Sequence, residues 1–253
     1  MNKRNAISVS AICPIRDEVE NIKYVFNTLP ELLYPTECIF VEGGSKDKSW
    51  EKTSKLNGRR NKHNVLFRLV KQMGTGKGEA VKTGFNYARG DLLIIVDADL
   101  SITPDDLKKV IKKLQENPGD VIVSGNRLRG VKKPKAFYWI NYIGNYFFRY
   151  YYSLILNDKI KDVSCGAKAM KRTTWKKIAK LRDAEGKLDI WGDIDWLYYG
   201  RRIDARIKYV NIDYCPRLHG TSKLQNIKTR WLFAFDMFII GIKIVYKNIT
   251  HNI

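Results

Sequence analysis

The first half of the chain alternates short apolar runs with longer segments of mixed polarity. Five runs have the length and the flanking turn residues that predict strands, and they cover residues 7–13, 37–42, 65–70, 91–97 and 121–124. Helix-length segments separate them, at about residues 19–33, 47–56, 79–88 and 103–114. This alternation predicts a doubly wound, mostly parallel sheet with helices on both faces.

Two of these segments give the clearest signals. Residues 91–97 are apolar almost throughout, which is typical of a central parallel strand buried on both faces. The next helix begins at Thr103, a natural N-cap, and continues with Pro104 and two acidic residues. Because ligands of doubly wound sheets bind at the carboxyl ends of the strands, functional side chains should lie just after the strands.

The second half of the chain is less regular. The elements predicted there are an aromatic-rich helix over 137–156, a short strand within 162–172, a helix over 193–203, a strand over 206–212 and a C-terminal helix over about 227–248. Neither an internal repeat nor a low-complexity linker is apparent. We therefore expect one domain over residues 1–225 and an amphipathic C-terminal helix within residues 226–253.

Charge narrows the classes of partner. The 253-residue chain is long enough for one α/β domain with its own core, and its formal net charge is +20. Such an excess attracts polyanions, which include nucleic acid, anionic lipid headgroups and phosphorylated substrates. The alternative is a lysine-rich surface that only confers solubility.

Cysteine spacing and hydropathy bear on the compartment. Four cysteines, Cys13, Cys38, Cys165 and Cys215, are scattered without a paired spacing and fit a reducing cytosol. The best candidate for a membrane span, residues 231–246, is shorter than the ~20 residues required and contains two charges. We expect a cytoplasmic protein.

Two carboxylates directly follow the most apolar strand. Asp97 and Asp99 flank Ala98, and carboxylate oxygens suit hard divalent cations. Mg²⁺ or Mn²⁺ held there would neutralise a diphosphate and help it to depart. The alternative is a pair of acids in a helix-capping turn. The pattern predicts a metal site at Asp97 and Asp99.

Three further loops follow predicted strands. Residues 74–78, Gly-Thr-Gly-Lys-Gly, lie between a strand and a helix, where glycines let a backbone approach phosphate and the helix N-terminus favours an anion. Residues 14–18, Pro-Ile-Arg-Asp-Glu, and residues 42–47, Glu-Gly-Gly-Ser-Lys-Asp, place carboxylates at the same edge of the sheet. Each loop taken singly is equally consistent with an ordinary turn or helix cap.

Together these loops resemble the family-2 glycosyltransferases of the GT-A fold. Residues 14–18 look like that family's Pro-x-x-Asn-Glu, residues 41–47 like its Val-Asp-Asp-Gly-Ser-x-Asp, and residues 76–78 and 97–99 like its Gly-Lys-Gly and Asp-x-Asp. Asp17, Glu42 and Gly43 depart from the pattern, and Gly43 removes a carboxylate. The resemblance implies an inverting transfer from a UDP- or GDP-linked sugar. The donor-binding residues that it implies are Pro14, Asp17, Glu18, Glu42, Lys77 and Asp97, and its metal ligands are Asp97 and Asp99.

The resemblance continues into the second half of the chain. Residues 124–127, 162–166, 192–195 and 217–223 look like the dolichyl-phosphate mannose or glucose synthase branch, whose acceptor is a polyprenyl phosphate. The implied acceptor-phosphate residues are Arg127, Arg129, Arg217, Ser222 and Lys223. The implied catalytic residues are Asp193, Asp195, Arg127 and Arg217.

Two alternatives stay open. Asp193 and Asp195 sit where relatives with hydroxyl acceptors place a base. The first alternative is therefore an acceptor other than a polyprenyl phosphate, namely a sugar hydroxyl in glycolipid, lipopolysaccharide or surface-glycan synthesis. Acids at a helix start also simply complement its dipole. A basic nucleic-acid-binding protein would explain the charge but not the four loops, and we expect no nucleic-acid partner.

Aromatic residues of the 137–156 segment follow Lys132, Lys133 and Lys135. Amphipathic rings beside cations are typical of an interfacial helix on anionic lipid, and the C-terminal helix offers a second such face. The alternatives are packing in the core or in an oligomer. We expect peripheral attachment to the cytosolic face of a membrane.

Overall fold

The computed structural model describes residues 7–33, 35–129, 139–220 and 226–250. Within them, seven strands form one sheet in the order β3-β2-β1-β4-β6-β5-β7. The strands are β1 Val9–Ile15, β2 Thr36–Glu42, β3 Leu66–Lys71, β4 Leu92–Ile95, β5 Val121–Asn126, β6 Lys168–Lys171 and β7 Arg206–Asn211. The predicted doubly wound, mostly parallel sheet is confirmed. β6 alone among them runs antiparallel, and it pairs with both β4 and β5.

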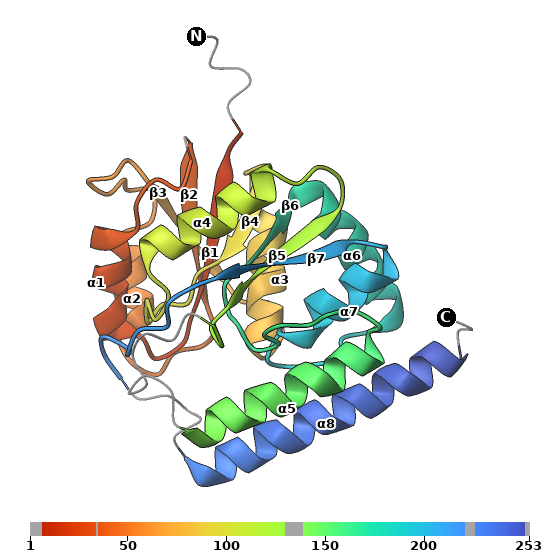
Figure 1. The fold of residues 1–253 in the computed structure, drawn as a ribbon. Coiled ribbons are helices and arrows are strands. Elements are labelled where there is room, and N and C mark those ends of the chain that lie inside the picture. Colours follow the sequence, from red (N-terminus) through yellow and green to blue (C-terminus); the bar gives the residue numbers. More distant parts are fainter. Residues whose placement is uncertain (1–6, 34, 130–138, 221–225, 251–253) are drawn as a thin grey trace.

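Helices cover both faces of this sheet (Figure 1). They are α1 Val19–Thr28, α2 Ser49–Ser54, α3 Lys77–Tyr87, α4 Pro104–Gln115, α5 Trp139–Ile155, α6 Arg172–Glu185, α7 Ile194–Arg202 and α8 Ile227–Thr250. Side chains of α1 and α4 join one buried cluster with alternate residues of β1. Side chains of α3, α6 and α7, together with α5 and α8, join the cluster on the opposite face.

Local sequence explains several of these boundaries. The Thr103 hydroxyl accepts a hydrogen bond from the backbone N–H of Asp106, so this residue is the N-cap of α4 as predicted. α1 ends at Thr28, earlier than predicted, just before the Leu29-Pro30 step, because the residue preceding a proline avoids the helical region. α6 was not predicted, because half of its residues are charged and only Thr174, Trp175, Ile178 and Arg182 are buried.

α5 and α8 lie side by side beneath the carboxyl edge of the sheet (Figure 1). The hydroxyls of Tyr151 and Tyr152 donate to the backbone oxygens of Phe238, at 3.0 Å, and Met237, at 2.6 Å. A side chain at Gly241 would overlap the Tyr151 ring, so the close approach of the two helices requires glycine there. None of the helices in the described part of the chain is long and apolar enough to cross a membrane.

Candidate active site

A cavity of about 1590 Å³ opens at the carboxyl edge of the sheet. Its polar wall comes from the loops after β1 and β4, from the turn before α3, and from residues 190–193 and 214–220. Its apolar wall comes from the N-terminal halves of α5 and α8, which contribute Ile143, Phe147, Trp231 and Phe235 among others. One space therefore joins a charged region to an apolar trough between two helices.

Asp97 and Lys77 form an ion pair in the polar wall. The Lys77 ammonium lies 2.6 Å from Oδ1 of Asp97. Burial opposes ionisation of both groups, but their mutual attraction outweighs it, which lowers the pKa of Asp97 and raises the pKa of Lys77. Oδ2 of Asp97 points to Gly166, where any side chain would overlap the carboxylate. Gly166 thus leaves room around the oxygen that Lys77 does not hold.

Asp99 sits two residues further on, with its carboxylate almost fully buried. Oδ1 accepts a hydrogen bond from the N–H of Ser101, and Oδ2 lies 3.1 Å from the Arg217 guanidinium. Within the described residues, no group of three or more acids, histidines and cysteines is arranged to hold a metal ion. Asp97 and Asp99 offer two carboxylates, which suits a hard divalent cation that takes its remaining oxygens from a diphosphate and water. Asp97 and Asp99 fit Mg²⁺ or Mn²⁺ in this sense.

The glycine-rich turn before α3 packs tightly against a distant loop. Gly76 is the N-cap of α3, with a φ of 97° that favours glycine, and a Cβ there would lie 2.5 Å from the carbonyl oxygen of Ile190. The N–H of Gly78 donates to that same oxygen at 3.2 Å. α3 therefore begins at Lys77, not at residue 79 as predicted, and its first turn is fixed to residues that also line the cavity.

The loops after β1 and β2 hold each other in place. Asp17 accepts from the N–H of Lys46 at 2.7 Å and donates its own N–H to the Ser45 hydroxyl at 3.0 Å. Asp17 and Glu18 line the cavity, as does Pro14. Glu42 is buried, accepts from the N–H of Ser45, and lies outside the set of lining residues. The structure thus places Glu42 in the support of the loop.

Arg127 lines the cavity and is anchored from behind. Its Nε and Nη2 lie 2.8 and 2.9 Å from the two carboxylate oxygens of Asp162, and its guanidinium is 5.3 Å from the ring centre of Tyr214. Asp162 is fully buried; burial disfavours its charge, but Arg127 lowers its pKa. The sequence predicts Asp162 only as part of the 162–166 motif and assigns it no role of its own. Arg129 is exposed and does not line the cavity, and Ser222 and Lys223 lie outside the described residues.

The two acids at the start of α7 have different surroundings. Asp193 lines the cavity, and its Oδ1 lies 3.0 Å from the ammonium of Lys168. Lys168 is fully buried and donates as well to the backbone oxygens of Val163, at 3.1 Å, and Cys165, at 2.5 Å. All three ammonium protons therefore have acceptors, and Asp193 is held in a fixed place at the cavity wall.

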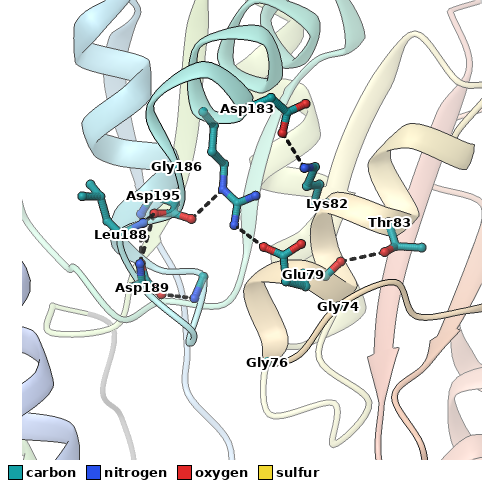
Figure 2. Close-up of polar contacts among 12 residues, drawn as sticks. Gly74, Gly76, Glu79, Lys82, Thr83, Asp183, Gly186, Leu188, Asp189 and Asp195 are labelled. Carbon is teal, nitrogen blue, oxygen red and sulfur yellow. Dashed lines mark hydrogen bonds and ion pairs between the residues drawn. The ribbon is translucent and has the colours of Figure 1, made fainter.

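Asp195 belongs to a buried network behind the cavity (Figure 2). Its carboxylate pairs with Nε of Arg182 at 2.7 Å and accepts from the N–H groups of Leu188 and Asp189. Arg182 reaches on to Glu79 in α3, also at 2.7 Å. The network therefore ties α3, α6 and α7 to the loop that carries Asp193, and Asp195 lies outside the cavity wall.

Asp189 is the most perturbed carboxyl of this network. It accepts hydrogen bonds from the N–H groups of Gly192, Ile194 and Asp195. Burial, and then the charges of Asp195 and Asp193, outweigh these bonds and raise its pKa to about 6. The loop between α6 and α7 thus contains a group that changes its protonation state in mildly acidic solution.

We expect Asp195→Ala to destabilise the fold by about 3–5 kcal/mol, because it leaves the buried Arg182 guanidinium without its partner. Thermal or urea unfolding measures this loss. Asp183→Ala is the matched control on α6, since the Lys82–Asp183 pair has a carboxylate that is 56% exposed and should contribute at most about 1 kcal/mol. An Asp195→Ala variant of normal stability and no activity would instead assign Asp195 to the chemistry.

Comparison with known proteins adds to this geometry. The model of the family described as "Glycosyl transferase family 2" matches residues 10–178. A dolichol-phosphate mannosyltransferase of Pyrococcus furiosus is 33% identical over 131 residues, which are 50% of this chain and 35% of the relative. A dodecaprenyl-phosphate galacturonate synthase of Rhizobium johnstonii is 23% identical over 247 residues, covering 96% and 69% of the two chains. The chain thus spans about a third of the length of the first relative.

A solved structure supports the fold. Glucosyl-3-phosphoglycerate synthase from Mycobacterium tuberculosis, in complex with Mn²⁺, uridine diphosphate and glucosyl-3-phosphoglycerate, superposes with a TM-score of 0.59 at 17% identity. The superposition covers 90% of this chain and 77% of that one. At this level of identity the likeness concerns the arrangement of helices and strands, and it confirms the GT-A-like fold.

Proposed function

This chain belongs to glycosyl transferase family 2, and we propose that it moves a sugar from a nucleotide-diphosphate donor to a polyprenyl phosphate, with inversion at the anomeric carbon. The observation that carries the proposal is the single cavity that joins Lys77, Asp97 and Asp99 to the apolar trough between α5 and α8. A donor with a charged diphosphate suits one region, and an acceptor with a hydrocarbon chain suits the other. Both relatives reported above have a polyprenyl phosphate in their names.

The polar wall supplies the donor site. Our candidates for contacting the nucleoside are Pro14, Asp17 and Glu18, which line the cavity. Our candidate for contacting the diphosphate is Lys77, because it lies at the N-terminus of α3 beside Asp97. A divalent cation bound by Asp97 and Asp99 would neutralise the charge that develops on the departing diphosphate. The Mn²⁺ complex of the structural relative supports a metal of this kind.

A phosphate acceptor sets a particular requirement. Its oxygens are already anionic near neutral pH, so it needs cations to hold it and no base to deprotonate it. Arg217 lines the cavity beside Asp99 and can offer a planar guanidinium to a phosphate. Arg127, fixed by Asp162, adds positive charge to the same wall. These two residues are our candidates for positioning the acceptor phosphate.

Asp193 favours a second candidate function. A sugar hydroxyl loses a proton as it attacks, and a carboxylate at the cavity wall could accept that proton. Asp193 is the one acid of the predicted pair that lines the cavity. Transfer of the same donor sugar to a glycan or glycolipid hydroxyl is therefore the alternative.

A donor panel tests the general proposal. Purified protein with Mn²⁺ and polyprenyl phosphate should release nucleoside diphosphate from one or a few nucleotide sugars, and omission of the acceptor should remove most of the release. Release that does not depend on any acceptor would indicate a hydrolase and contradict the proposal.

We also propose that the protein attaches peripherally to an anionic membrane surface, on the cytosolic side, through α5 and α8. Both helices carry exposed apolar side chains, of which Leu154 is 83% exposed and Trp231 71% exposed. The exposed residues of this surface are Ile143, Phe147, Tyr150 and Leu154 on α5, and Trp231, Leu232, Phe235, Ile242 and Tyr246 on α8. Four of them, Ile143, Phe147, Trp231 and Phe235, also line the apolar wall of the cavity. The basic run that was predicted beside them, Lys132 to Lys135, lies outside the described residues.

Binding to anionic vesicles should weaken at least tenfold in Trp231→Ser and in Phe235→Ser, because burying one such side chain contributes roughly 1.5–3 kcal/mol. Binding of the wild type should also weaken with salt, since screening acts over a Debye length of about 8 Å at physiological ionic strength. Co-sedimentation measures both effects. Trp50→Ser on α2 is the control, because Trp50 is exposed but lies away from α5 and α8. Equal binding by all variants would refute this membrane-binding surface.

A further inference from the structure

The side chain of Gln72 occupies an unusual place at the cavity wall. Gln72 directly follows β3 and lines the cavity. Its Nε2 donates to the carbonyl oxygens of Gly74, at 3.1 Å, and Gly76, at 2.9 Å. Carbonyl oxygens only accept hydrogen bonds, so this pair fixes the orientation of the amide and keeps Oε1 as an acceptor on the other side.

The absence of a side chain at Gly43 leaves the space that Oε1 of Gln72 occupies. A Cβ at residue 43 would lie 2.5 Å from Oε1 of Gln72, so any side chain there would displace the amide. The motif that residues 41–47 resemble has a carboxylate at this position. The chain therefore lacks an acidic side chain at residue 43. The neutral Oε1 of Gln72 occupies the space that such a side chain would enter.

The order of the strands shows which part of a donor reaches Gln72. Asp97 and Asp99 follow β4, and the sheet continues from β4 through β1 and β2 to β3 on one side. Neighbouring strands are about 4.8 Å apart, so the ends of β2 and β3 lie roughly 10–14 Å from the end of β4. Residues 14–18 and Gln72 line the same cavity as Asp97 and Asp99. A nucleoside linked to a diphosphate at Asp97 would therefore have Gln72 within reach.

We propose that Oε1 of Gln72 reads the nucleobase of the donor and selects uracil or thymine. This inference rests on the proposed nucleotide-sugar function and names its donor class. Uracil and thymine present one N–H on the pairing edge, at N3, and one acceptor oxygen satisfies it. Cytosine and adenine present a ring nitrogen lone pair there, which repels Oε1. Guanine presents two adjacent N–H groups, which match the two oxygens of a carboxylate at residue 43 better than the single oxygen of an amide.

Binding of nucleoside diphosphates in the presence of Mn²⁺ tests the proposal. By calorimetry, the wild type should bind uridine and thymidine diphosphates at least about tenfold more tightly than the cytidine and guanosine compounds, because the disfavoured bases leave a polar group unpaired. Gln72→Ala should weaken binding of uridine diphosphate about tenfold and reduce its preference over cytidine diphosphate to less than about threefold. Met73→Ala, at an exposed neighbour on the same turn, should leave affinity and preference unchanged.

A second variant separates base recognition from the shape of the turn. Gln72→Ala also removes the two bonds to Gly74 and Gly76, so inorganic pyrophosphate with Mn²⁺ serves as the probe of the phosphate region. Gly43→Asp in the Gln72→Ala background should raise the affinity for guanosine diphosphate relative to uridine diphosphate, because its carboxylate enters the vacated space and offers two oxygens to the two N–H groups of guanine. A wild type that prefers guanosine diphosphate overturns the proposal. A Gln72→Ala variant that keeps its preference for uridine overturns it as well, whatever its affinity for pyrophosphate. A wild type that binds none of the four nucleotides contradicts the proposed function itself.

Discussion

Asp97→Asn and Asp99→Asn should each lower the rate of sugar transfer by about a thousandfold, because each would remove a charged ligand from the divalent cation that we propose for stabilising the departing diphosphate. That factor corresponds to about 4 kcal/mol in the activation barrier. Steady-state turnover with Mn²⁺ measures it. Each variant also loses the charge that pairs with Lys77 or with Arg217, so its thermal unfolding is measured alongside its turnover, at an assay temperature where the variant is folded.

The control for this experiment is Asp105→Asn, whose carboxylate is 86% exposed on α4 and lies outside the cavity. It should turn over like the wild type. Removal of the metal with excess EDTA should abolish activity, and added Mn²⁺ should restore it. Full activity in EDTA would show that Asp97 and Asp99 act without a metal.

Arg217→Ala should lower transfer to polyprenyl phosphate by about a hundredfold or more, because charge-assisted bonds to a phosphate contribute roughly 1.5–3 kcal/mol each. Donor binding should change by less than about threefold, although Arg217 also contacts Asp99. The rate of transfer by Arg217→Lys should fall between the rates of the wild type and of Arg217→Ala, since lysine keeps the charge but loses the bidentate geometry. Asp193→Asn should slow the reaction less than tenfold, because a phosphate acceptor needs no base.

The opposite pattern would change the class of acceptor. If Asp193→Asn were inactive and Arg217→Ala nearly normal, Asp193 would be the base for a sugar hydroxyl. Calorimetry with donor alone completes the comparison, since it shows whether either variant has lost the donor rather than the acceptor step. Asp195→Ala belongs to neither pattern, because the structure places it in the buried pair with Arg182.

The sequence predicted the donor half of the fold well, for a physical reason. β1, β2 and β4 are buried parallel strands with continuous apolar runs. The loops after them carry glycines and acids, which can be recognised from the sequence alone. The second half was predicted less completely. α6 was missed, because its exposed surface is largely charged and gives no clear periodicity. β6 lies within the short strand predicted over 162–172, but it is only four residues long. Nothing in the sequence indicated that β6 runs antiparallel.

Predicting individual site residues from the sequence was limited by burial and orientation. Asp193 and Asp195 are two positions apart, but one side chain lies at the cavity wall and the other is fully buried with Arg182. Glu42 follows β2 as the motif suggests, but its carboxylate supports its own loop. Gln72 was not singled out, because its importance depends on the open space at Gly43, which only the folded sheet brings beside it.

The buried network that contains Asp195 joins the start of α3 to the loop between α6 and α7. Glu79, Arg182 and Asp195 link the first turn of α3 to residues 186–193, and Gly76 and Gly78 pack against the same loop (Figure 2). The turn that carries Lys77 and the loop that carries Asp193 are therefore held together as one unit. If the proposed function is right, this arrangement fixes the region for the donor phosphates and the region for the acceptor relative to each other.

Transfer to matched acceptors tests the central claim most directly. The protein is incubated with Mn²⁺, a radiolabelled nucleotide sugar chosen from the donor panel, and either polyprenyl phosphate or the same polyprenol without its phosphate. The account predicts labelled lipid with the phosphate alone, joined through a phosphodiester that phosphorus NMR identifies. Equal labelling of the polyprenol, or labelling that requires a glycan hydroxyl in place of the lipid phosphate, would contradict it.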